Sequence, residues 1–140
     1  MWSVDFGAIN WLAVVVASVA SFMIGGVWYA VVFGKAWQRL HGFSDDQVKA
    51  MGASPARTFG ILGVCDVAAA VVLAILVQKV GAVTLVDGIG LGVWCWILAM
   101  VAVVVSTYTA AGLKPGLMLI DGGKVGVCLV VMGAILGVWR

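Results

Sequence analysis

Three charged residues interrupt long apolar stretches of this sequence, and they are its strongest candidates for chemistry. Asp66 lies in one such stretch, and Asp121 and Lys124 lie three residues apart in another. Two carboxylates and an ammonium group can pair with one another, exchange protons or bind ions. Since residues three apart share one face of a helix, Asp121 and Lys124 are expected to point in similar directions.

The sequence around these charges has the composition of an integral membrane protein. No charge occurs in the 29 residues between Asp5 and Lys35, or in the 26 residues between Asp87 and Lys114. About 20 apolar residues cover the roughly 30 Å hydrocarbon core of a bilayer. Hydrophobic residues make up 64% of the chain and charged residues 10%, and the mean hydropathy is +1.20. A water-soluble helix needs a polar face, so we expect the chain to lie in a lipid bilayer.

Four segments are long and apolar enough to cross the bilayer. They cover residues 9–33, 58–78, 88–109 and 116–139, and each can span the hydrocarbon core with modest tilt. The sequence therefore predicts an all-α fold, an integral membrane four-helix bundle in a single domain over residues 1–140. A polar first loop over residues 34–57 separates the first two spans.

The distribution of Lys and Arg predicts the orientation. Cytoplasmic loops are enriched in these residues, and five of them fall in the loops after the first and third spans, against two on the opposite side. The five are Lys35, Arg39, Lys49, Arg57 and Lys114, and the two are Lys79 and Arg140. The first loop is therefore expected in the cytoplasm, with both termini outside.

The first loop contains a signal for the start of a helix. Ser44 with Gln47 three residues later is a capping box, and Gly52 follows. A short helix is expected from Asp45 to Met51. Basic and aromatic residues before it suit the headgroup region, so this segment is either a simple interfacial hairpin or a surface for a partner or for lipid. The residues that mark this interfacial loop are Lys35, Trp37, Arg39 and Ser44.

Small residues recur every four positions, a pattern that allows close helix packing in lipid. Such ridges occur on nearly every span, which exceeds what one bundle of four helices needs. We therefore expect a homo-oligomer or a place in a larger membrane complex. The packing residues are Ala13, Ala17, Ser21 and Gly25 in the first span, and Gly122, Gly126, Gly133 and Gly137 in the fourth.

Asp66 and Lys124 are expected at the same depth in the membrane. Asp66 follows Arg57 by nine residues and Lys124 follows Pro115 by nine, which is about 13 Å along each helix. A charge there costs roughly 2.5–3.5 kcal/mol unless it meets a partner or water. Two interpretations stay open. Either Asp66 pairs with Lys124 and Asp121 completes the network, or this intramembrane polar cluster lines a pathway for protons, ions or a small solute.

Other chemistry has little support in the sequence. The three cysteines fall one per apolar segment without metal or disulfide spacing, and are expected to pack as small apolar residues rather than with methionine in a soft-metal site. His41 has no second ligand at a suitable spacing. No catalytic motif or phosphate loop occurs, so neither an enzyme nor a cofactor is expected. The scattered basic residues argue against a nucleic-acid partner.

Three parts of the chain carry a resemblance to a known family. They are Asn10-Trp11 near the start, the string Trp28-Tyr29, Phe33-Gly34-Lys35, Trp37, Leu40, Gly42 and Ser44, and the segment from Met132 to Trp139. The chain thus resembles the small bacterial membrane proteins grouped as domain of unknown function 1761, over nearly its full length. The resemblance implies a four-helix protein of the bacterial inner membrane, and it brings no activity, substrate or catalytic residue.

Two classes of function remain. The first is a non-enzymatic packing or accessory subunit that associates with itself or with a larger complex. The second is an oligomeric transporter or channel for protons, ions or a small solute, which would use Asp66, Asp121 and Lys124. The accessory subunit is slightly favoured, because polar groups converge nowhere else. A transporter should keep Asp66 accessible to water, whereas an assembly subunit should hide it.

Overall fold

Four long helices dominate the computed structural model, which describes residues 3–139. Each is long and apolar enough to cross a membrane, which confirms the predicted all-α fold class of a multi-pass membrane protein. The first consists of α1 (Trp11–Val27) and a π-helical turn, η2 (Trp28–Val32). The second is α4 (Pro55–Val80). The third consists of α5 (Leu85–Ala99), a π-helical segment, η3 (Met100–Val105), and α6 (Ser106–Ala110), and the fourth is α7 (Pro115–Val138).

Short helices precede and follow the first span. A 3-10 turn, η1 (Phe6–Ala8), comes before α1, and α2 (Gly34–His41) and α3 (Asp45–Met51) lie between the first two spans. The predicted capping box starts α3: the Ser44 hydroxyl accepts a hydrogen bond from the Gln47 amide (3.2 Å), and the Gln47 side chain accepts one from the Ser44 amide (2.8 Å). The sequence did not predict α2, which ends at Gly42, where φ is +73°.

Local signals start two spans earlier than the apolar pattern alone predicts. α4 begins at Pro55 rather than at residue 58, because proline suits the first turn of a helix, where an amide donor has no partner. α5 begins at Leu85 rather than at residue 88, because Thr84 and Asp87 form a second capping box. Charged residues such as Arg57 are thereby included in the helices, near their ends.

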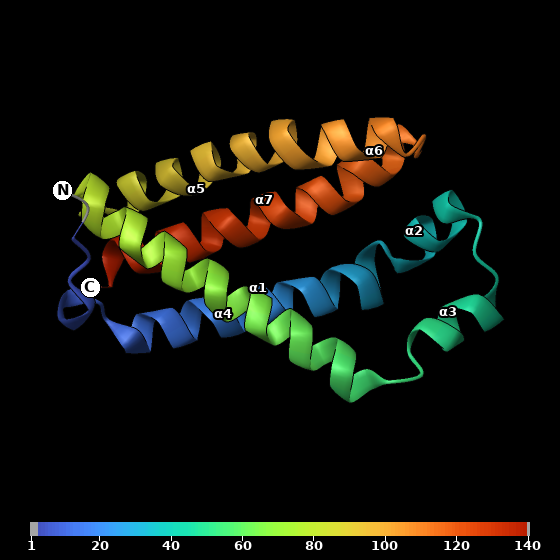
Figure 1. Cartoon of the computed structure of the whole chain (residues 1–140), viewed down its shortest axis with the longest axis horizontal. Helices are drawn as coiled ribbons and strands as arrows, with labels where there is room; N and C mark the ends of the chain where they lie inside the picture. Colours follow the sequence, from blue (N-terminus) through green and yellow to red (C-terminus); the bar gives the residue numbers. More distant parts are fainter. Residues whose placement is uncertain (1–2, 140) are drawn as a thin grey trace.

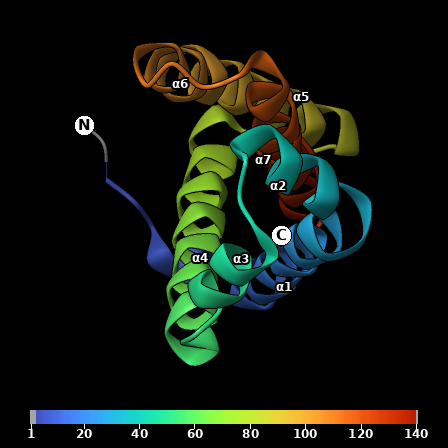
Figure 2. The ribbon, with the colours of Figure 1, turned by 90° about the vertical axis from the view of Figure 1, so that its right-hand side faces the viewer.

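α7 is the central helix of the bundle. It packs along α5 and also contacts α1 and α4, and it is the most buried of the four spans. Figure 1 shows α5 and α6 along one side of α7 and α1 along the other, while α4 crosses α1. The start of α1 and the end of α7 lie at one end of the bundle, and α2 and α3 lie at the other (Figures 1 and 2).

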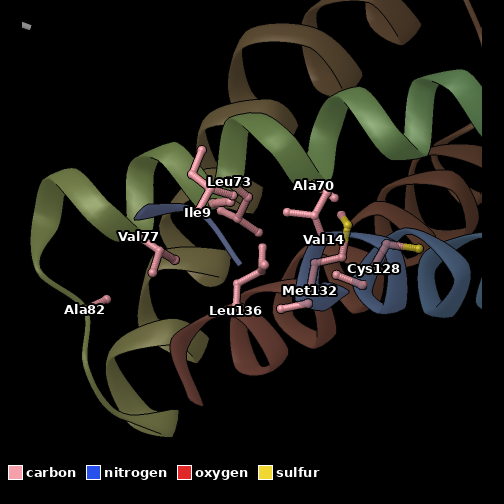
Figure 3. Close-up of a cluster of buried hydrophobic side chains, with 12 residues drawn as sticks. Ile9, Val14, Ala70, Leu73, Val77, Ala82, Cys128, Met132 and Leu136 are labelled. Atoms are coloured by element: carbon pink, nitrogen blue, oxygen red, sulfur yellow. The ribbon is translucent and has the colours of Figure 1, made fainter. Parts of the chain in front are cut away.

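The apolar core lies where α1, α4 and α7 meet (Figure 3). Ala13 and Ala17 of α1 and Ala70 of α4 are each 0% exposed. These small side chains let the two helices cross at close range, and Leu73 and Met132 fill the space beside them. The ends of α1 and α4 diverge on either side of this crossing.

Glycine brings the backbones of α5 and α7 into direct contact. A Cβ atom on Gly88 or Gly92 would collide with a backbone carbonyl of α7, and a Cβ atom on Gly133 would collide with the carbonyl of Gly88. A Cβ atom on Gly137 would lie 2.8 Å from the carbonyl oxygen of Thr84. Only glycine permits this separation, and close packing of small residues is what drives helix association in lipid.

The predicted packing residues are used inside one chain. Seven are buried, and Gly25 is half-buried beside Lys124. The ridges therefore no longer serve as an argument for contacts between copies, and homo-oligomerisation stays a prediction. The seven are Ala13, Ala17, Ser21, Gly122, Gly126, Gly133 and Gly137.

Substitution of Gly88 by alanine tests the contact between α5 and α7. Gly88→Ala should lower the free energy of unfolding by about 1–3 kcal/mol, the usual cost of overpacking. Gly90→Ala in the same helix is the matched control, since no atom lies within 4 Å of its added Cβ, and it should be neutral or slightly stabilising. Unfolding in mixed micelles with increasing SDS measures both. Equal stability of the two variants would contradict the packing.

Candidate functional site

Asp121 joins three spans through two tyrosines. Its Oδ1 accepts a hydrogen bond from the Tyr29 hydroxyl (2.5 Å), and its Oδ2 accepts one from the Tyr108 hydroxyl (2.8 Å). Tyr29 lies in η2, Tyr108 in α6 and Asp121 in α7. Hydrogen bonds to an ionised acceptor are among the strong ones, and a carboxylate inside a membrane requires such partners. These three residues are named the aspartate–tyrosine clamp.

Two tryptophans hold the same part of α7. The Trp28 indole N–H donates to the carbonyl of Ile120 (3.0 Å), and the Trp96 indole N–H donates to the carbonyl of Gly122 (2.8 Å). Trp28 comes from the first span and Trp96 from the third. The segment that carries Asp121 is therefore fixed from two sides.

Glycines of α7 make room for these aromatic rings. A Cβ atom on Gly123 would lie 3.2 Å from the Trp28 ring, and one on Gly126 would lie 2.8 Å from Trp96 Nε1. The predicted small-residue ridge thus has two uses along α7. Near Asp121 it accepts side chains, and near the end of the helix it accepts the backbone of α5.

Two π-helical segments lie beside the clamp. Trp28 and Tyr29 open η2, where the Phe33 amide donates to the Trp28 carbonyl (2.8 Å), and Tyr108 follows η3 by three residues. π-helical turns are rare and occur frequently at functional sites. A π-helical segment changes the angular position of the residues that follow it, so η3 affects where Tyr108 points relative to the start of its span.

Asp66 borders a cavity of about 440 Å³. Its lining is mainly apolar, with one carboxylate from α4 and one ammonium group from α7. Asp66 Oδ1 accepts a hydrogen bond from the Ser21 hydroxyl (2.6 Å). The residues that line this α1–α4 cavity are Phe22, Gly25, Gly26, Tyr29, Ala30, Phe59, Leu62, Cys65, Asp66 and Lys124.

Lys124 reaches the α1–α4 cavity across a glycine of α1. A Cβ atom on Gly25 would lie 3.2 Å from Lys124 Cε and 3.8 Å from Lys124 Nζ, so the end of the lysine side chain passes close over this glycine. Within residues 3–139, the Lys124 ammonium has neither a hydrogen bond nor an ion pair. It is a half-buried cation without a protein partner.

The structure divides the predicted polar cluster into two parts. Asp66 and Lys124 border one cavity, but in the described part of the chain no ion pair joins them. Asp121 belongs instead to the clamp, and Tyr29 lies between the two parts because it binds Asp121 and also lines the cavity. Hydroxyl groups take the place of the expected ion pair: two tyrosine hydroxyls donate to Asp121, and the Ser21 hydroxyl donates to one oxygen of Asp66.

The residues of the predicted interfacial loop lie apart from the cavity. Lys35 and Arg39 are exposed on α2, the Trp37 ring contacts the rings of His41 and Phe43 at centroid distances of 4.3 and 5.8 Å, and Ser44 caps α3. α2 also contacts α7. The segment is a short amphipathic helix attached to the end of the bundle.

Sequence reasoning did not identify Tyr29 and Tyr108 as partners of Asp121. Their signal was indirect: Tyr108 stands in a run of four hydroxyl residues at the end of the third span, and Tyr29 follows the motif tryptophan Trp28. Ser21 was predicted to pack, and its hydrogen bond to Asp66 was not predicted. A hydroxyl on a small-residue ridge can do both.

Comparison with known proteins assigns the family. A family described as "Protein of unknown function (DUF1761)" matches residues 12–137, nearly the whole chain. The chain belongs to this family. Family membership confirms the resemblance found in the sequence, and brings no activity with it. Comparisons with curated proteins and with solved structures gave no significant match.

Removal of one tyrosine hydroxyl tests the clamp. Tyr29→Phe and Tyr108→Phe should each lower the free energy of unfolding by about 1–2 kcal/mol, because each leaves a carboxylate oxygen without its donor in lipid. In an Asp121→Leu background the same substitutions should cost much less, as SDS unfolding in a double-mutant cycle would measure.

Ser106→Ala is the control for the tyrosine variants. Its hydroxyl donates only to carbonyls of its own span, those of Ala102 and Val103, so its loss should change stability little. If the tyrosine variants lower the free energy of unfolding equally with and without the carboxylate of Asp121, the clamp is contradicted.

Proposed function

We propose that this protein is a small membrane transporter that binds its solute within the bilayer, in the α1–α4 cavity. The observation that carries the proposal is the pair of opposite charges, Asp66 and Lys124, that border one cavity without contacting each other. Two charges that served only to fix helix register would be expected to meet, since an ion pair removes much of the penalty for their burial. Charges held apart are free to bind a guest.

The size and lining of the cavity suit a small molecule. Ligand pockets usually measure about 300–1,000 Å³ and are mostly apolar, with a few polar groups that fix orientation. The α1–α4 cavity, at about 440 Å³, falls within this range. Phe22, Phe59 and Leu62 supply its apolar walls, and Asp66 and Lys124 supply the polar groups.

The closed side of the cavity favours a carrier over a channel. Beyond Ser21 the crossing of α1 and α4 is filled by Ala17, Ala70 and Leu73, which are at most 2% exposed. This core separates the α1–α4 cavity from the end of the bundle where α1 begins. A solute bound at Asp66 could pass only if the crossing opened, which is alternating access rather than a continuous pore.

A second candidate, the accessory subunit, is favoured by the first half of α4. Its apolar residues have few contacts within the chain, and Phe59, Ile61 and Val64 are 56%, 54% and 70% exposed. A partner helix could cover this face as lipid does. In that case the α1–α4 cavity would be the seat of a neighbouring side chain, and it would hold no water.

Cys65 provides the test that separates these functions. It lines the α1–α4 cavity and is exposed, whereas Cys128 is buried. In proteoliposomes, a charged thiosulfonate that cannot enter hydrocarbon should modify Cys65 from one side about tenfold faster than Cys128, because a thiol reacts as the thiolate and needs water nearby. Peptide mapping by mass spectrometry measures both sites in the same protein.

An apolar maleimide is the control reagent. Modification of Cys65 by the maleimide and not by the charged reagent would mean that this face meets lipid or a partner helix, and the accessory subunit would then replace the transporter. Asp66→Asn should leave the access of the charged reagent intact, because it changes a charge and not the shape of the cavity.

A further inference from the structure

We infer that the solute of the α1–α4 cavity is a zwitterion with an apolar side, a molecule that carries an ammonium group and an anionic group close together. The inference rests on the proposed function and names its substrate class. It depends on which atoms of the cavity still lack partners and on the sign of their charge.

Two groups of opposite sign remain available to a guest. Ser21 donates to Oδ1 of Asp66, and within the described residues Oδ2 has no protein donor. The Lys124 ammonium, which lies over Gly25, has no protein acceptor in the same range. The cavity therefore offers one acceptor of negative charge and one donor of positive charge.

Charge balance excludes a guest with a single sign. A bound anion would pair with Lys124 and leave Asp66 beside a second negative group in a medium of low polarity, and a bound cation would do the reverse with Lys124. A zwitterion pairs with both residues and leaves the site neutral. It also carries no net charge through the membrane potential, which acts on each unit of charge that is moved.

The remaining walls favour an apolar portion on the same molecule. Phe22 and Phe59 pack edge to face, with centroids 6.1 Å apart, and Leu62 lies beside them in the lining. Gly25, Gly26 and Ala30 of the first span add no bulky side chain to the lining. Two common sources of this combination are an apolar α-amino acid and the head of phosphatidylethanolamine with the start of its acyl chains.

The test measures protection of Cys65 in the full-length wild-type protein. The protein is placed in phosphatidylcholine nanodiscs, because this lipid has a quaternary ammonium without N–H donors, and the modification rate with the charged thiosulfonate is followed. L-leucine should slow modification about fivefold or more, since a bound guest fills a pocket of this size. 4-methylpentanoate and 3-methylbutylamine, which each lack one of the two charges, should have no effect.

A second set of nanodiscs separates the two sources of the zwitterion. If phosphatidylethanolamine slows the modification of Cys65 without any amino acid, the guest is the lipid head, which equally supports the inference. The protection, by whichever source, should be lost in Asp66→Asn and Lys124→Gln. It should persist in Lys114→Gln, whose exposed charge lies outside the cavity.

Three results would overturn the inference. Equal protection by 4-methylpentanoate or 3-methylbutylamine would mean that one charge suffices, and the transporter proposal would stand with a different substrate class. If the charged reagent modifies Cys65 and neither L-leucine nor phosphatidylethanolamine slows the reaction, the zwitterion is rejected and the transporter proposal again stands with a different substrate class. If the charged reagent fails to modify Cys65 in every nanodisc, both the proposed function and the inference are rejected.

Discussion

The close approach of α7 to its neighbours is the constraint on which the rest of the structure depends. Lipid tails are as apolar as the helices, so the hydrophobic effect does not drive the helices together. Their association depends instead on close packing between the atoms of neighbouring helices. The glycines of α7 meet the backbone of α5 at Gly133 and Gly137, and they receive the rings of Trp28 and Trp96 further along. α7 carries both Asp121 and Lys124, so the packing of this helix also determines where these two charged residues lie.

The two charged parts of the site differ in how completely they are satisfied. Asp121 has a hydroxyl donor on each oxygen and a fixed backbone on either side. Asp66 has one donor, and Lys124 has no acceptor among the described residues. In lipid an unsatisfied polar group is costly. This difference separates Asp121 from Asp66 and Lys124, although sequence spacing made the three residues look alike.

The sequence predicted the fold well, because its strongest signals are local. The four spans follow from the length of uncharged stretches, the start of α3 from Ser44 and Gln47, and the packing surfaces from small residues four apart. Counting residues along two helices predicted that Asp66 and Lys124 lie at the same depth, and both border one cavity. Each of these inferences uses only the regular geometry of an α-helix.

The site could not be predicted in detail, because its partners depend on departures from that geometry. Tyr29 and Tyr108 reach Asp121 from spans that contain the π-helical segments η2 and η3, and no residue pattern marked those segments. Depth alone also implied that two opposite charges at one level would meet. In the structure the Lys124 side chain instead extends across Gly25, and the Ser21 hydroxyl donates to Asp66. Both contacts depend on tertiary structure.

The π-helical segments have a consequence for how this family can vary in length. A regular helix advances by about 100° per residue, whereas a π-helical turn holds one residue more than an α-helical turn. The deletion of one residue within η2 or η3 would therefore be absorbed, while a deletion in a regular turn would rotate everything after it by roughly 100°. In the third span such a deletion would carry Tyr108 away from Asp121. We therefore expect single-residue insertions and deletions among relatives to occur in the connections between helices or within η2 and η3, and to be excluded from the regular turns that hold the tyrosines in place.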